Sequence, residues 1–305
     1  MMMVKIAIWT DVDLDGAGSQ LALRWLLDKA YPGKVEITVK QSGPSRLREE
    51  FLKWLNTNKI SDFTSIFICD LDTTPIADLI DASNVTILDH HESHIAQAVK
   101  YKRAKAVVRV CRSTMQLIYE QWNDVLDKKL TAPQKRLIAH VSDYDSYSLT
   151  LADTKKLNYL YWTYVGNRIE QFAKEFYNGF TGFTQLQTNA INLHYRKVAD
   201  ITSKLVTFCG KLNDYYVIST FCETAHSDVA EFISGKYNPD IIMLVNPKMS
   251  TVSFRRALTC KADLSKIAAA LCEGGGHEAA AGGKLTEAFL TFSKNLSPCN
   301  HDTSE

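Results

Sequence analysis

The first half of the chain alternates between short apolar runs and segments with apolar residues at helical spacing. Runs rich in β-branched residues predict strands at residues 4–9, 35–39, 65–69 and 85–88. Amphipathic segments between and after them predict helices, for instance at 19–29, 44–56 and 114–122. Strands that alternate with helices are typical of a doubly wound, mainly parallel sheet.

The second half has a different pattern. Residues 153–207 are predicted to be helical, and 185–207 form one long amphipathic helix. Strands then follow at 215–220, 241–246 and 251–254, with helices at 227–234 and 264–271. We therefore predict an α/β protein with four parts: a larger domain over 1–180, a helical linker over 181–210, a smaller α/β domain over 211–295, and a flexible tail over 296–305.

Composition narrows the class of protein. The chain has 305 residues, of which 46% are hydrophobic, and this is enough for two ordinary cores. A net charge of +1 argues against a protein that coats long nucleic acid by bulk attraction. Seven scattered cysteines without a C-x-x-C pair do not indicate a disulfide framework. No signal peptide or apolar stretch of about 20 residues is evident, so we expect a cytoplasmic protein without membrane partners.

Acidic residues and histidines follow several predicted strands. Asp89, His90 and His91 come directly after the strand at 85–88, and Asp70 follows the strand at 65–69. Charged and imidazole groups at such positions are costly without partners, but they are good ligands for divalent metals. Because sites form at the carboxyl ends of parallel strands, these groups are expected to lie together. Asp143, after another apolar run, is a further candidate.

The turn after the first strand reads Asp-Val-Asp-Leu-Asp-Gly. In an extended turn, residues two apart point the same way, so Asp11, Asp13 and Asp15 are expected to converge on a cation. An EF-hand is excluded because Ala22 occupies the twelfth loop position and a strand precedes the loop. A phosphatase of the haloacid-dehalogenase type, with Asp13 as nucleophile, and a simple solvated turn are the alternatives.

Two further segments suggest phosphate binding. Residues 93–119 contain no acid and six basic residues, including Arg109 and Arg112, so this segment is either a phosphate-facing wall or a solvated face. Farther along, a glycine-rich run lets backbone N–H groups approach an anion, although it matches neither the P-loop nor the dinucleotide fingerprint. Its candidate phosphate-binding residues, with a nearby arginine, are Gly274, Gly275, Gly276, His277 and Arg255.

In this combination the chain resembles the DHH phosphoesterase superfamily, whose name matches the Asp89-His90-His91 triplet. The motifs occur in the family's order, from Asp11–Gly16 through Asp70 and the triplet to Asp143, and then Ser253-Phe254-Arg255 and the glycine run. The family often has His at the position of Asp11, which here is as in the RecJ-like exonuclease branch. Glu273 stands where many relatives have a fourth glycine.

The resemblance implies roles for these residues. Two manganese ions, with Mg²⁺ or Co²⁺ as substitutes, would be bound. Asp13 and Asp70 would hold one ion, with Asp11 as an additional candidate. The second ion would be held by Asp15, Asp70, His90 and Asp143. His91 would face the scissile phosphate, and Asp89 would orient its neighbours. The C-terminal domain would bind the substrate through Arg255, the glycine amides and His277.

The resemblance also implies a reaction. We expect two-metal hydrolysis of short single-stranded oligonucleotides from an end, because the run at 143–146 and the aromatic helices after it are similar to the oligoribonuclease ("nanoRNase") branch. Hydrolysis of cyclic dinucleotides or 3′-phosphoadenosine 5′-phosphate, and a RecJ-like DNA exonuclease, are alternatives within the superfamily. A haloacid-dehalogenase-like phosphatase and a non-catalytic nucleic-acid binder are alternatives from other classes. The sequence leaves the oligomeric state open, and a homodimer is compatible with it.

Overall fold

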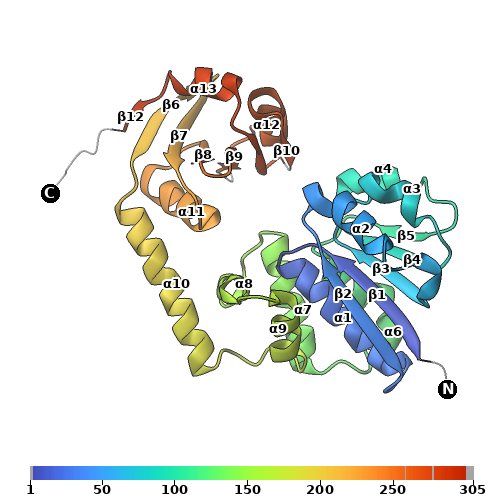
Figure 1. The fold of residues 1–305 in the computed structure, drawn as a ribbon. Helices are drawn as coiled ribbons and strands as arrows, with labels where there is room; N and C mark the ends of the chain where they lie inside the picture. Colours follow the sequence, from blue (N-terminus) through green and yellow to red (C-terminus); the bar gives the residue numbers. More distant parts are fainter. Residues whose placement is uncertain (1–2, 258, 277, 300–305) are drawn as a thin grey trace. The chain divides into compact units, whose positions relative to one another are not determined.

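The protein divides into two compact units. The computed structural model describes residues 3–257, 259–276 and 278–299, and contacts separate Met1–Ile191 from Asn192–Glu305. The division falls inside the long helix α10 (Gln185–Ser203), which lies within the range predicted as a linker (Figure 1).

The first unit is built on a five-stranded sheet. Its strands follow the order β2-β1-β3-β4-β5, and every neighbouring pair is parallel. The predicted doubly wound parallel sheet is therefore confirmed. The edge strand β5 was not predicted from the sequence, because it is short, half-exposed and begins with a lysine. The strands are β1 (Val4–Thr10), β2 (Val35–Gln41), β3 (Ser65–Cys69), β4 (Val85–Asp89) and β5 (Lys105–Val108).

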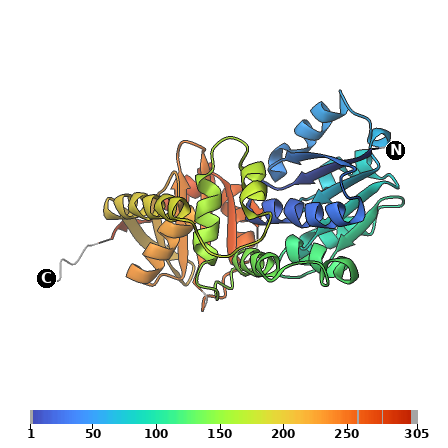
Figure 2. The ribbon, with the colours of Figure 1, turned by 90° about the horizontal axis from the view of Figure 1, so that it is seen from below.

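Helices cover both faces of this sheet, because successive strand residues point to opposite sides. Ile6 and Ile8 of β1 belong to the core beneath α1, whereas Trp9 packs against Phe51 and Trp54 of α2 on the other face. Figure 2 shows α1 lying along the sheet. The elements before residue 100 are α1 (Leu14–Ala30), η1 (Pro44–Arg46), α2 (Leu47–Leu55), η2 (Ile60–Asp62), η3 (Thr74–Ile76), α3 (Ala77–Ile80), η4 (Glu92–His94) and α4 (Ile95–Ala98).

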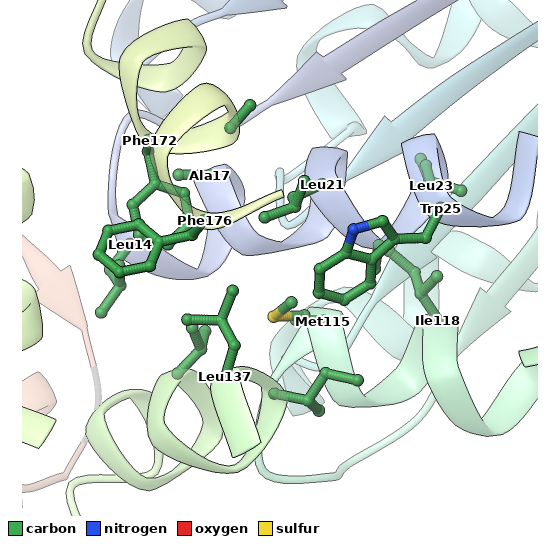
Figure 3. Close-up of a cluster of buried hydrophobic side chains, with 14 of the residues drawn as sticks. Leu14, Ala17, Leu21, Leu23, Trp25, Met115, Ile118, Leu137, Phe172 and Phe176 are labelled. Carbon is green, nitrogen blue, oxygen red and sulfur yellow. The ribbon is translucent and has the colours of Figure 1, made fainter. Parts of the chain in front are cut away.

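The larger core joins α1 to the helices that follow the sheet. Figure 3 shows Leu21 and Trp25 of α1 beside Met115 and Ile118, with Phe172 and Phe176 near the start of α1. All of these side chains are buried. This packing fixes the beginning of α1 against later parts of the chain. The later helices of this unit are α5 (Thr114–Gln121), α6 (Asn123–Leu126), α7 (Ala132–Asp145), α8 (Thr154–Thr163) and α9 (Arg168–Phe176).

The turn that enters α1 is tighter than predicted. The helix begins at Leu14, and the Asp13 side chain caps it by accepting a hydrogen bond from the Gly16 N–H at 2.8 Å. The prediction of an extended turn through Asp15 was therefore wrong. A Cβ at Gly16 would lie 2.3 Å from the Asp11 carbonyl oxygen, so the turn folds back onto the helix at a position where only glycine fits.

The second unit contains the predicted smaller α/β fold. Its sheet has the order β10-β11-β9-β8-β7-β6-β12; β7 and β8 are parallel, and the other pairs are antiparallel. Phe254 and Phe289 are buried in its core. The elements are β6 (Thr207–Leu212), β7 (Tyr215–Phe221), α11 (His226–Tyr237), β8 (Ile241–Asn246), β9 (Thr251–Arg256), α12 (Leu264–Cys272), β10 (Gly275–Gly276), β11 (Ala280–Lys284), α13 (Glu287–Ser293) and β12 (Ser297–Pro298). Among the described residues, no helix combines the length and apolar character needed to cross a membrane.

Candidate metal and phosphate site

Acids and histidines meet where β1, β3 and β4 end. β1 lies between β2 and β3 in the sheet, so the chain reverses its winding between β1 and β3, and such switch points are where doubly wound sheets bind ligands. Three groups there bring possible ligand atoms within 4.8 Å of one another. The groups are Asp15 with His90 and Asp145, Asp70 with His90 and His91, and Asp89 with His91 and His94.

His90 lies in two of these groups. Its Nδ1 is 3.2 Å from the carbonyl oxygen of Cys111. A carbonyl can only accept, so Nδ1 carries a proton, and Nε2 is the nitrogen that faces the acids. Nε2 is buried and lies 3.0 Å from Asp145 Oδ2 and 3.5 Å from Asp70 Oδ1. A buried imidazole nitrogen that faces two carboxylates fits a metal ligand.

Asp15 and Asp70 are both held by the start of α5. The buried Asp15 carboxylate accepts hydrogen bonds from the backbone N–H groups of Thr114 (2.6 Å) and Met115 (3.0 Å). The Thr114 hydroxyl donates to Asp70 Oδ1 at 3.2 Å. Asp70 has a left-handed backbone, with φ of 59°, which is uncommon for a residue other than glycine and is found at functional sites.

The charges in this cluster are unbalanced. Burial, reinforced by repulsion from other carboxylates, raises the pKa of Asp13 and Asp70 well above its ordinary value, and raises that of Asp15 to about 7. Burial lowers the pKa of His90, but the hydrogen bond and charge of Asp145 outweigh it and bring the value to about 9. Buried carboxylates that repel one another are stabilised by a cation, so the residues present fit a metal site.

Asp143 and Asp145 have different positions in the site. The buried Asp143 carboxylate accepts hydrogen bonds from the backbone N–H groups of Thr150 and Leu151. The hydroxyls of Thr150 and Thr154 also donate to it, at 2.7 and 2.8 Å. The structure therefore brings Asp145, and not the predicted Asp143, to the cluster. Residues two apart on a helix lie about 200° apart around its axis, so only one member of the Asp-Tyr-Asp run faces the strands.

Asp11 lies beside the cluster without joining its three groups. Burial raises the pKa of its carboxyl, which is half-buried. The charges of Asp11, Asp15 and Asp145 all contribute to the raised pKa of Asp13, so these carboxylates face a common region despite the helical turn. The structure thus keeps the predicted acids together through α1 and not through an extended strand.

Two basic residues predicted to bind phosphate have acidic partners. The Arg109 guanidinium forms an ion pair with Glu120. Arg112 lies 3.2 Å from Asp143 Oδ1 and also donates to the Ser146 hydroxyl. Both side chains are about half-exposed. Their charges are therefore partly neutralised within the first unit.

The glycine run of the second unit forms a short hairpin. Gly275 pairs with Gly282, and Gly276 with Ala281. A Cβ at Gly274 would lie 2.0 Å from the Gly282 carbonyl oxygen, whereas at Gly275 it would meet nothing within 4 Å. Close backbone approach thus explains the glycine at 274. Arg255 is on the neighbouring strand β9, and His277 lies outside the described residues.

Comparison with known proteins identifies the first unit. Residues 5–144 match the DHH family, N-terminal domain. Residues 5–144 form a DHH domain. DHH-family proteins are phosphoesterases, and the triplet at the end of β4 supplies the residues after which the domain is named. No curated protein matches the chain.

Solved structures share the fold of this protein at low identity. An exopolyphosphatase-related protein from Bacteroides fragilis is 17% identical, with a TM-score of 0.52, and the match covers 96% of this chain and 91% of that one. CDC45 from Entamoeba histolytica is 9% identical, with a TM-score of 0.51 and coverages of 96% and 94%. Exonuclease RecJ bound to manganese is 13% identical, with a TM-score of 0.45 and coverages of 95% and 88%. The first two likenesses support the fold alone.

Two residues at the site were not assigned from the sequence. Asp145 follows Asp143 by two residues in the same helix, α7. The helical period could have shown that these two carboxylates point in different directions and that only one of them faces the strands. His94 follows His91 by three residues, and its Nδ1 is hydrogen-bonded to Asp89 Oδ2. In the sequence, the one feature that could have indicated His94 was its closeness to the triplet. In the structure, a short turn after β4 brings its side chain back toward Asp89.

Proposed function

We propose that this DHH phosphoesterase is a manganese-dependent phosphodiesterase that hydrolyses short oligonucleotides from an end. The observation that carries the proposal is the buried Nε2 of His90, which faces the carboxylates of both Asp70 and Asp145. Imidazole with several carboxylates is a donor set that suits manganese and related divalent ions.

The ligands would be divided between two ions. Asp13 and Asp70 would hold one, with Asp11 nearby, and Asp15, Asp70 and His90 would hold the other. Asp145 would take the place in the second set that the family resemblance implied for Asp143, because the Asp143 oxygens already accept hydrogen bonds. Bound ions would lower the pKa of a coordinated water and offset negative charge on the phosphate.

The protein's own residues would orient the phosphate. His91 is a quarter exposed, and its Nδ1 is 2.8 Å from Asp89 Oδ1, which holds the ring in the orientation in which its Nε2 would contact the substrate. Thr114 would keep Asp70 in position, and the backbone of α5 would keep Asp15 in position. In the second unit, Arg255 and Gly274–Gly276, with His277, are proposed to bind the end of the substrate.

Charge supports a short substrate. The net charge is +1, and both Arg109 and Arg112 have acidic partners. A protein that binds long nucleic acid neutralises many phosphates with free basic side chains. A substrate with few phosphates needs fewer such contacts. The same argument favours oligonucleotides over a non-catalytic nucleic-acid binder.

The test is hydrolysis by purified full-length protein with Mn²⁺. The panel contains RNA of two to five nucleotides, longer single-stranded DNA, cyclic di-AMP, 3′-phosphoadenosine 5′-phosphate and polyphosphate. We expect the short RNA to be cleaved fastest, and labels at the 5′ or 3′ end to reveal the polarity. Asp70→Asn should abolish cleavage, and His91→Ala should leave only a slow residual rate. Preference for another member of the panel would reassign the substrate, and full activity of His91→Ala would refute the mechanism.

A further inference from the structure

Asp89 holds two histidines with its two oxygens. The carboxylate is buried at the end of β4. Oδ1 accepts hydrogen bonds from the backbone N–H of His91 at 3.1 Å and from the ring Nδ1 at 2.8 Å. Oδ2 is bonded to Nδ1 of His94. The His94 backbone N–H donates to the His91 carbonyl oxygen at 3.1 Å and closes the turn between them.

These bonds determine how both rings are protonated. Asp89 Oδ1 accepts from the His91 backbone N–H, so the carboxylate acts as an acceptor, and His91 and His94 each carry a proton on Nδ1. Each ring therefore presents Nε2 away from Asp89.

His91 has a competing partner. Its Nδ1 also lies 3.7 Å from Asp70 Oδ1, in the proposed metal cluster. The orientation of the Asp89 carboxylate thus decides whether His91 Nδ1 stays bonded to Asp89 or turns toward Asp70. His94 is the residue placed to fix that orientation, because it binds the second oxygen and its ring lies 5.0 Å from the ring of His91.

We propose that His94 is a positioning residue, which locks the Asp89 carboxylate and thereby holds the His91 ring in the tautomer and orientation that face the substrate. The proposal rests on the proposed function in one respect, namely that His91 contacts the phosphate. Without His94, Asp89 Oδ2 loses its partner in a buried place, and the carboxylate rotates to recover one. His91 then loses its fixed orientation.

Two substitutions separate this role from a substrate contact. The side-chain amide of His94→Asn places an N–H donor near the position of Nδ1 but has nothing at Nε2, whereas His94→Ala removes both. We expect His94→Ala to lower kcat about tenfold to a hundredfold, as for other residues that orient a functional histidine, with KM nearly unchanged. His94→Asn should recover most of kcat. Ser93→Ala, an exposed neighbour in the same turn, is the matched control and should behave as wild type.

A double-mutant cycle distinguishes positioning from general structural support. If His94 acts through His91, His94→Ala should slow the His91→Ala variant no further, because the group that it positions is gone. A merely structural role would give additive losses. Additive losses, or a His94→Asn variant as slow as His94→Ala, would overturn the proposal.

A spectroscopic measurement tests the same coupling without any substrate. Nitrogen-15 NMR of histidine-labelled full-length protein reports the tautomer of each ring. We expect His91 to carry its proton on Nδ1 in wild type and in His94→Asn, and to become a mixture of tautomers in His94→Ala. An unchanged His91 in His94→Ala would refute the proposal. If the tautomer shifts as expected while no phosphodiester is cleaved by wild type, the proposed function fails and the positioning role stands.

Discussion

The two aspartates at the end of α7 give the sharpest test of the site. Asp143→Asn replaces one acceptor oxygen by an N–H₂ group that faces donors. The two oxygens accept five hydrogen bonds, two or three on each, including one from the Arg112 guanidinium. The hydroxyls can turn to other acceptors, but one backbone N–H is left facing the new amide N–H₂ group. Because a buried group left unsatisfied costs about 1–3 kcal/mol, we expect a loss of about that size in the free energy of unfolding of the first unit.

Asp145→Asn should have the opposite profile. Its carboxylate is one-fifth exposed and attracts His90, but it repels Asp13, Asp15 and Asp70. These effects oppose each other, so the metal-free stability should change by less than about 1 kcal/mol, the scale of a partly exposed ion pair. The loss of a ligand should weaken Mn²⁺ binding at least about tenfold.

The assay combines thermal unfolding of the metal-free protein with Mn²⁺ titration followed by electron paramagnetic resonance, which counts free ions. Asp143→Asn should lower the melting temperature and, where still folded, bind the ions nearly as wild type does. Asp145→Asn should melt near wild type and bind weakly. An Asp143→Asn variant that is stable but cannot bind metal, together with normal binding by Asp145→Asn, would refute the assignment.

Three further predictions concern the same site. Burial raises the pKa of Asp15 from 3.8 to about 7. The protonated Asp15 carboxyl therefore favours the folded, metal-free protein at low pH, and this contribution to the free energy of unfolding is lost as the pH rises through 7. The melting temperature gained on adding Mn²⁺ should consequently grow between pH 5.5 and 7.5, and a gain that shrinks over this range would contradict the reasoning. Gly16→Ala should disrupt the turn, destabilise the first unit by more than about 2 kcal/mol and weaken metal binding, whereas Gly43→Ala, whose Cβ meets nothing within 4 Å, should be neutral in the same melting and binding assays. Thr114→Val removes the hydroxyl bond to Asp70 but keeps the backbone bond to Asp15. Titration should therefore show a several-fold loss of Mn²⁺ affinity in Thr114→Val, and the same substitution should cause little further loss in an Asp70→Asn background; an equal loss in both backgrounds would contradict this role.

The sequence predicted the sheet well because its strands are buried runs with strong patterns. β3 and β8 have the predicted bounds, and β4 extends the predicted strand by Asp89 alone. The prediction failed where the chain is half-exposed or rich in glycine, as in β5 and β11. In β5 and β11, hydrogen bonds to a neighbouring strand, and not side-chain burial, determine the structure. Such pairing leaves no pattern of hydrophobic residues by which it could be predicted from one sequence.

For the site, placement at strand ends was predictable, but the direction of each side chain was not. Strand topology alone brings Asp70 and the triplet to one edge of the sheet. The choice between Asp143 and Asp145 depends on how α7 is rotated about its axis, which the packing of Leu137 and Val141 determines. Likewise, His94 reaches Asp89 only because a tight turn follows the strand.

The bond between Asp15 and the start of α5 has a consequence for synthesis of the chain. Thr114 and Met115, which donate to Asp15, follow it by 99 and 100 residues in the sequence. His90 contacts Asp145 only when α7 is in place. A nascent chain that has emerged only as far as β4 possesses the triplet and the first acids but lacks α5, which fixes Asp15 and Asp70. We therefore expect the proposed metal site to form only after translation has passed α7, so that its occupancy would mark completion of the DHH domain.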